Sequence, residues 1–202
     1  MRRSACIFLH EGRGRRRFYR LAEPEAYTLA VDGVIRGLDK IPQQRYARLL
    51  GLFCAEAHKH PWIKSIILFG SVARGNARTD SDIDLLVVVE GFDSLGQSLE
   101  KLVEIEESPK VSREIRWLEE HGIDTHISFY PISPSTLAEH PPIILDTLID
   151  GIVLMDDGTY LRVAKEAKQN LKKLHARRIM LSDHEWVWVL KPNLRFGEVI
   201  EI

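Results

Sequence analysis

The sequence predicts an α+β fold in which a small mixed β-sheet is flanked by helices. Two short apolar runs, 62–69 and 83–89, are rich in isoleucine or valine and are typical of buried strands. A third run, 124–130, alternates between apolar and polar residues, as a half-buried strand does. Amphipathic helical patterns lie before, between and after these runs. A chain of 202 residues that is 45% hydrophobic suits one globular domain, or one domain with a small appendage.

The first half of the predicted core alternates between helix and strand. After Ile41-Pro42, the residues Tyr46, Leu49, Leu50, Phe53 and Ala57 share one face of a helix, which Pro61 ends. A buried strand over Trp62–Phe69 leads into a turn at Gly70–Gly75, where a short helix opens. A second buried strand follows at Ile83–Val89.

The second half is predicted to be mainly helical. We expect helices at Ser94–Glu107, at Val111–His121 and over 134–150, a strand at Asp124–Tyr130, a hairpin at Gly151–Leu161 around Asp157-Gly158, an amphipathic helix at Leu161–Leu174, and a strand or packed tail at Trp186–Leu190. Breaks are expected at Ser108-Pro109 and at Pro141-Pro142.

These elements suggest three parts: a basic N-terminal extension (1–40), a core (41–135), and a helical and hairpin extension packed on the core (136–202). The extension begins with seven arginines, at positions 2, 3, 13, 15, 16, 17 and 20. Such a cluster forms either a basic arm for a polyanion or a solvated start of the chain, and we favour the second. The net charge of −1 argues against electrostatic nucleic-acid binding by the whole molecule.

The chain carries no sign of a secreted or membrane protein. Cys6 and Cys54 are too few for a disulfide framework, and no spacing of cysteine and histidine suggests a zinc site. The apolar run Ile7–Leu9 is too short for a signal peptide, and no run approaches the length needed to cross a bilayer. We therefore expect a cytoplasmic protein without a membrane partner.

Chemistry is most clearly indicated between residues 70 and 84. A strand is predicted to run into Gly70-Ser71, where a helix begins, and a helix start offers free backbone N–H groups to a phosphate. Gly70 lets the backbone come close, and the Ser71 hydroxyl adds a donor. Alone, this pattern is equally that of a serine N-cap on an ordinary helix.

The second half of this segment carries a pair of carboxylates. Asp82 and Asp84 lie two residues apart at the start of a strand, so both point to the same face. Their like charges repel, and a divalent cation removes that cost. Mg²⁺ prefers one or two carboxylates together with phosphate oxygens and water. A phosphate-binding turn beside such a pair is what phosphoryl or nucleotidyl transfer requires.

The segment Gly70-Ser71-x-x-Arg74-Gly75, followed by Ser81-Asp82-Ile83-Asp84, resembles the signature of the DNA polymerase β-like nucleotidyltransferase superfamily. It is most similar to the minimal prokaryotic and archaeal type, as in kanamycin nucleotidyltransferase, and the chain's end, Trp188–Ile202, resembles the tail of archaeal members. The resemblance implies a polymerase β palm-like fold. It implies that Gly70 and Ser71, with Gly75 in the same turn, hold a nucleoside triphosphate, and that Asp82 and Asp84 bind Mg²⁺ or Mn²⁺. Arg74 would contact phosphate or pair with Asp80.

The superfamily usually has a third carboxylate on a later strand, and this chain departs from that pattern. Asp124 and His126 are the candidates on the predicted third strand, which also carries Ser128. A histidine suits the role of general base because an unperturbed imidazole titrates close to neutral pH. Three alternatives stay open: Asp124 completes the site, His126 does, or no third group exists.

The function that the resemblance implies is metal-dependent transfer of a nucleoside monophosphate, AMP from ATP in the simplest case, to an acceptor hydroxyl. A small molecule, an RNA or a protein would each suit this core as acceptor, and self-association into a homo-oligomer is left open. The alternative is a weakly active or inactive nucleotide-binding regulator, such as an antitoxin-like protein, on the same fold.

Overall fold

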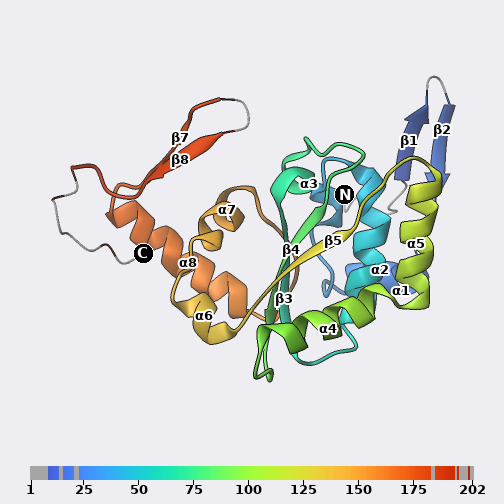
Figure 1. Cartoon of the computed structure of the whole chain (residues 1–202), viewed down its shortest axis with the longest axis horizontal. Coiled ribbons are helices and arrows are strands. Elements are labelled where there is room, and N and C mark those ends of the chain that lie inside the picture. Colours follow the sequence, from blue (N-terminus) through green and yellow to red (C-terminus); the bar gives the residue numbers. More distant parts are fainter. Residues whose placement is uncertain are drawn as a thin grey trace.

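The computed structural model describes residues 9–13, 16–20, 23–182, 185–193, 195 and 200, and its centre is a four-stranded sheet (Figure 1). The strand order is β5-β4-β3-β6, with β3 at Ile63–Phe69, β4 at Ile83–Val89, β5 at Ile127–Ile132 and β6 at Ile152–Asp156. β3 is antiparallel to both β4 and β6, whereas β4 and β5 are parallel. The predicted α+β class with a small mixed sheet is confirmed.

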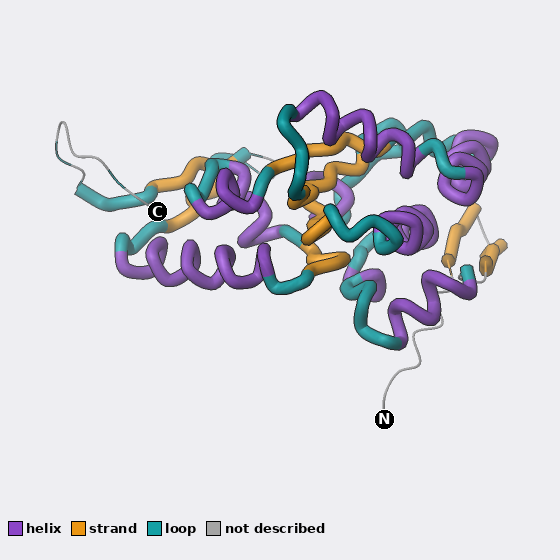
Figure 2. Tube along the Cα trace, turned by 90° about the horizontal axis from the view of Figure 1, so that it is seen from below, coloured by secondary structure: helices purple, strands orange, loops and turns teal. Residues whose placement is uncertain are grey.

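Helices cover both faces of the sheet. The central strands β3 and β4 carry apolar side chains on both faces, and each face must be buried. One layer contains α1 (Pro24–Val31), α2 (Ala47–Ala57), α4 (Leu95–Glu106) and α5 (Pro109–Glu120). The other contains α6 (Pro134–Ala138), α7 (Ile143–Asp150) and α8 (Thr159–Lys173). Figure 1 shows the two groups on opposite sides of the strands, and Figure 2 shows the same arrangement from below.

Each layer has its own apolar core. Ile66 and Leu85 belong to the cluster that α2 fills with Phe53, whereas their neighbours Ile67 and Leu86 belong to the cluster on the other face. Part of the first core comes from the segment before α2: Ala26, Ile35 and Leu38 are all buried, and Leu38 begins the 3₁₀ turn η1 (Leu38–Lys40). A second turn, η2 (Gln44–Tyr46), leads directly into α2.

Two hairpins lie at opposite ends of the molecule (Figure 1). β1 (Leu9–Arg13) pairs with β2 (Arg16–Arg20), and β7 (Arg177–Met180) pairs with β8 (Trp186–Val189). Of the seven N-terminal arginines, Arg2, Arg3 and Arg15 lie outside the described residues, as does Cys6; for β1 and β2 only the backbone pairing is described. None of the described helices is both long and apolar enough to cross a membrane.

Two predicted elements differ from the structure. The third strand begins at Ile127 rather than at residue 124, because Thr125 turns its hydroxyl to the carbonyl of Ser81 instead of entering the sheet. The hairpin expected around Asp157-Gly158 is wrong. Its first half is β6, which pairs with β3, and Gly158 instead precedes the first turn of α8 in a left-handed conformation. A glycine in the left-handed conformation suits a hairpin turn and also the turn that joins a strand to a helix, so the sequence pattern does not distinguish the two.

Candidate active site

The backbone at Gly70 lies directly against the carboxylate of Asp84. β3 ends at Phe69, and Phe69 is paired with Asp84 of β4, so the start of α3 (Gly70–Arg74) meets that side chain. Gly70 has φ +71°, and a Cβ built there would lie 1.9 Å from Oδ2 of Asp84. No other residue fits this position without displacing the carboxylate. The turn predicted to hold phosphate and the predicted metal ligand are therefore in contact.

Gly75 closes the same short helix on its other side. It adopts φ +81°, and a Cβ there would lie 2.7 Å from Cβ of Pro42. Because α3 is a single turn of five residues, its macrodipole is small, and the free N–H groups of Gly70 and Ser71 are the donors that it can offer. Ser71 is half-buried, and no described residue accepts a hydrogen bond from its hydroxyl.

The two aspartates differ in their surroundings. Asp82 has a side chain that is 47% exposed, whereas Asp84 is half-buried, with the fully buried Ile83 between them. Burial, and then the like charge of Asp82, raise the pKa of Asp84, and the positive charges of Arg74 and His126 oppose that shift in part. A cation placed beside Asp84 would stabilise its ionised form.

The place for a third carboxylate holds a serine. Ser128 is the partner of Asp84 in the parallel pairing of β4 and β5, so the two side chains lie next to each other on one face. His126 approaches the pair from the loop before β5, and its Nδ1 lies 3.2 Å from Oδ1 of Asp82. Asp124 lies in the same loop, where it is exposed and has no hydrogen bond or ion pair with a described residue. Of the two predicted candidates, the structure brings only His126 into contact with the pair.

A second carboxylate near this loop was not anticipated. Glu106, at the end of α4, accepts a hydrogen bond of 3.2 Å from the backbone N–H of Ile127, and burial raises its pKa. It approaches β5 beside Ile127, a residue that belongs to the core shared with α2 and α4. It accepts from the backbone N–H of the first residue of β5, a contact that sequence spacing alone does not reveal.

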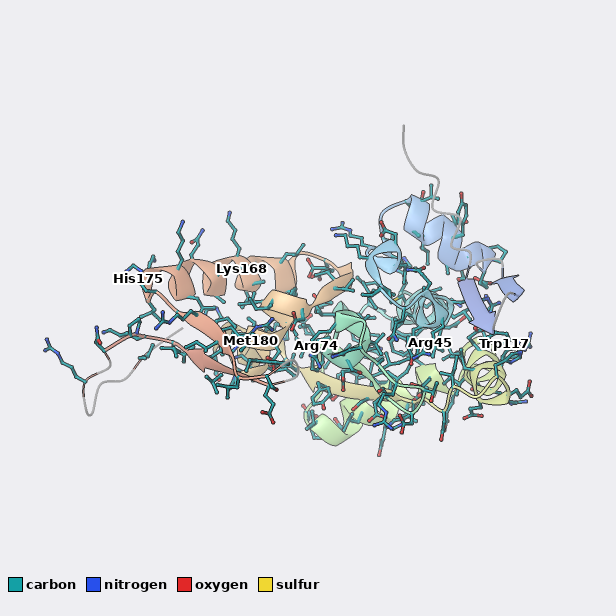
Figure 3. All side chains as sticks on the ribbon, turned by 90° about the horizontal axis from the view of Figure 1, so that it is seen from above. Arg45, Arg74, Trp117, Lys168, His175 and Met180 are labelled. Carbon is teal, nitrogen blue, oxygen red and sulfur yellow. The ribbon has the colours of Figure 1, made fainter. Side chains whose placement is uncertain are left out.

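Arg74 points toward the C-terminal hairpin. Its guanidinium carbon lies 5.0 Å from the ring centre of Trp186 in β8, and Arg178 of β7 lies at the same distance from that ring. In Figure 3 Arg74 lies beside the hairpin, where Met180 is labelled. The alternative of a pair with Asp80 is wrong, because Asp80 pairs with Arg78 at 3.4 Å.

The hairpin itself is anchored on α7. The indole N–H of Trp186 donates to Asp146 over 3.4 Å, and Arg178 forms an ion pair of 2.7 Å with Asp150. These contacts place an aromatic ring and a second cation next to the predicted nucleotide-binding turn, more than a hundred residues away in sequence. No local pattern signals that proximity.

The two carboxylates fit a magnesium ion whose remaining coordination positions are filled by the substrate and water. In the described part of the chain, no three histidine, cysteine or acidic side chains come together to hold a metal. Asp82 and Asp84 provide two carboxylates on an open face, and Mg²⁺ typically takes one or two carboxylates and fills its other positions with phosphate oxygens and water. The site therefore suits a metal that arrives with a nucleotide.

Replacing Gly70 tests the contact with Asp84. An alanine in the left-handed region costs about 1–2 kcal/mol of stability. We expect Gly70→Ala to lower the free energy of unfolding by more than this, because the new methyl group must also displace the Asp84 carboxylate. Gly33→Ala is the matched control: Gly33 has φ +75°, and nothing lies within 4 Å of its Cβ position. Urea denaturation of both variants decides, and equal losses would contradict the contact.

The raised pKa of Asp84 predicts how stability changes with pH when no metal is present. Ionising the Asp84 carboxyl is less favourable in the folded than in the unfolded chain, so its ionisation destabilises the fold. This destabilisation is absent below about pH 3.9, the ordinary carboxyl pKa, and is complete above the raised pKa of the folded chain. We therefore expect Asp84→Asn to melt at a higher temperature than the wild type at pH 7 in EDTA, with the difference disappearing toward pH 3.5. Asp80→Asn, an exposed change in the preceding loop, should show no such difference. A wild type that is equally or more stable than Asp84→Asn at pH 7 would contradict the prediction.

Comparison with known proteins agrees with this geometry. Residues 53–148 match the sequence profile of the nucleotidyltransferase domain family, and this range contains β3, α3, β4 and β5. No curated protein matches the chain. One similar solved structure, described as a toxin-antitoxin with AMP-PNP, shares 12% identity at a TM-score of 0.38, over 62% of this chain and 92% of its own. A likeness at that level says nothing about substrates. Residues 53–148 are therefore similar to nucleotidyltransferase domains, and this match supports nucleotidyl transfer as the general class of activity.

Proposed function

We propose that the protein transfers a nucleoside monophosphate, AMP from ATP, to an acceptor hydroxyl and releases pyrophosphate with the help of Mg²⁺ or Mn²⁺. The observation that carries the proposal is the contact between Gly70 and Asp84, which joins a phosphate-binding turn to a carboxylate pair. The bond formed joins the acceptor oxygen to the α-phosphorus, and the bond broken joins that phosphorus to the bridging oxygen of pyrophosphate.

Each group of the chain has a place in this reaction. Asp82 and Asp84 would hold the metal, which when bound neutralises charge on the phosphates. The N–H groups at Gly70 and Ser71 would hold the pyrophosphate as it leaves, where negative charge grows. Arg74 is exposed beside the turn and contributes a positive charge near Asp84.

The proton of the acceptor hydroxyl needs a destination, and two side chains are candidates. His126 touches Asp82, so it is close to the metal position, and this contact supports it over Asp124. Asp124 would have to swing from its exposed place in the loop. Ser128 cannot replace a carboxylate as a base, so a site without either candidate would depend on the metal to acidify the hydroxyl.

The overall function is tested with labelled nucleotides. The protein is incubated with Mg²⁺ and each α-labelled triphosphate, with cell extract as the source of acceptors, and transfer from ATP is expected. Fractionating the labelled product into small molecules, RNA and protein then identifies the acceptor class. Tight ATP binding without transfer to any fraction would favour the non-catalytic, antitoxin-like alternative instead.

Removing the carboxylate pair should abolish metal binding. We expect Asp82→Asn/Asp84→Asn to show no measurable Mn²⁺ binding by titration calorimetry, and to lose the tightening of Mn²⁺ binding that ATP produces in the wild type. Asp80→Asn provides the control, because Asp80 lies in the same loop but pairs with the exposed Arg78. Equal Mn²⁺ binding by the double variant and the wild type would exclude a metal at this pair.

The proton acceptor is identified by comparing two single variants. If His126 takes the proton, His126→Ala should bind ATP normally and lose transfer by about 10²–10⁴-fold, the usual contribution of a general base, while Asp124→Asn stays close to the wild type. The opposite result would assign the role to Asp124. If both variants transfer at the wild-type rate, neither side chain is the base and the metal alone activates the hydroxyl.

A further inference from the structure

The loop between α3 and β4 holds Asp82 in place although it contains little regular structure of its own. It runs from Asn76 to Ser81 and most of its side chains are exposed, apart from Ala77. Within the loop, the N–H of Arg78 donates to the hydroxyl of Ser81 over 2.8 Å. Such a short internal network does not by itself fix a ligand that follows it, so the support must come from outside the loop.

That support comes from three residues at and just before η2, at positions 43, 45 and 46. Gln43 Nε2 and Arg45 Nη2 donate to the carbonyl of Ala77 at 2.9 and 3.0 Å. Arg45 Nη2 and the hydroxyl of Tyr46 donate to the next carbonyl, that of Arg78, at 3.2 and 3.0 Å. We call Gln43, Arg45 and Tyr46 the loop brace. Two successive carbonyls of the loop thus receive four hydrogen bonds from residues more than thirty positions earlier.

The brace is itself rigid. Tyr46 is completely buried, its hydroxyl accepts from Arg45 Nη2 at 2.9 Å, and the guanidinium lies 4.8 Å from the centre of its ring. Directly before the brace, Pro42 packs against Gly75 at the end of α3. The segment 42–46 therefore contacts Gly75 and the first half of the stretch that separates Gly75 from Asp82.

The end of the loop is held by the segment just before β5, which carries the other candidate groups, Asp124 and His126. Thr125, which is buried, donates to the carbonyl of Ser81 at 2.7 Å. The N–H of Ile83 donates to the carbonyl of His126 at 2.9 Å. Asp82 lies between these two bonds, so its backbone is held by the segment before β5 and, through the loop, by the brace.

Stability alone does not explain the brace. Among the described residues, Oε1 of Gln43 and Nε of Arg45 are buried without a hydrogen-bond partner, which costs stability. In the part of the chain that the structure describes, no carboxylate pairs with Arg45. Its Nη2 donates instead to two carbonyls and a hydroxyl. Apolar side chains could fill this space but would give the carbonyls of Ala77 and Arg78 no donors, so the bonds to the loop are what distinguishes these residues from a simple core.

We propose that Gln43, Arg45 and Tyr46 are positioning residues for the metal pair, acting through the carbonyls of Ala77 and Arg78 to hold Asp82 at its distance from Asp84. This inference rests on the proposed metal site at that pair. The brace lies before residue 53, outside the range that matches the nucleotidyltransferase profile.

The test measures Mn²⁺ binding to the full chain by titration calorimetry, with the melting temperature recorded for every variant. Tyr46→Phe removes one hydroxyl without opening a cavity, and Gln43→Met removes one amide donor at similar volume. We expect each to weaken Mn²⁺ binding by about tenfold, the lower end of the effect of groups that orient metal ligands. Arg45→Met, which removes bonds to both carbonyls, should have the largest effect, and Arg45→Lys should restore only part of it because lysine lacks the planar fork.

Gln44→Met is the matched control. Gln44 is half-buried like Gln43 and also donates its amide to the backbone, but its two acceptors are the carbonyls of Leu38 and Ile41 rather than those of the loop. It should lower the melting temperature about as much as Gln43→Met and leave Mn²⁺ binding unchanged. Wild-type Mn²⁺ binding in the brace variants, or an equal loss in Gln44→Met, would overturn the positioning role.

A second measurement separates this inference from the metal site on which it rests. Amide hydrogen exchange over residues 76–83 needs no metal, and we expect it to be faster in Gln43→Met and Tyr46→Phe but not in Gln44→Met. If the wild type binds no Mn²⁺, the proposed metal site fails, while faster exchange would still support the brace. Unchanged exchange in the brace variants would overturn the brace whatever the metal result.

Discussion

The pairing of Phe69 with Asp84 is the constraint on which the rest of the site depends. It brings the end of one buried strand to the beginning of the next, so that α3 starts beside a carboxylate. Glycine is then required at position 70, because any side chain would occupy the volume of the Asp84 carboxyl group. Fold and candidate site are coupled here, because the antiparallel ladder of β3 and β4 also places the turn at Gly70 against the carboxylate of Asp84.

The electrostatics of the site follow from how few groups it contains. Asp84 is half-buried next to Asp82, and the opposing charges on Arg74 and His126 offset only part of the resulting rise in its pKa. Ser128, at the neighbouring position of β5, adds no charge. A third carboxylate there would bind a metal more tightly but would also increase the repulsion in its absence. In the proposed metal site, two carboxylates alone would leave more of the coordination to the phosphates of the nucleotide, which would tie metal affinity to substrate binding.

Some of this could be predicted from sequence and some could not. The strands β3 and β4 are readable because both are continuous apolar runs, and the pair Asp82 and Asp84 is readable because strand geometry repeats every two residues. The sequence predicts a hairpin at β6 and the start of α8, because Gly158 suits a hairpin turn and the start of a helix equally well. The alignment of Ser128 with Asp84 depends on the register of a parallel pair, which has no local signal. The contact of Arg74 with Trp186 joins segments whose spacing says nothing about proximity.

The segment that matches the nucleotidyltransferase profile does not hold its own site in place. From one side, Pro42 and the loop brace pack against Gly75 and the loop that leads to Asp82. From the other, Trp186 of the C-terminal hairpin lies against Arg74 at the end of the same α3 turn. A five-residue helix has too few internal hydrogen bonds to keep its geometry alone. The parts before and after the matched range therefore support the candidate site, because they pack against the α3 turn and against the loop that precedes Asp82.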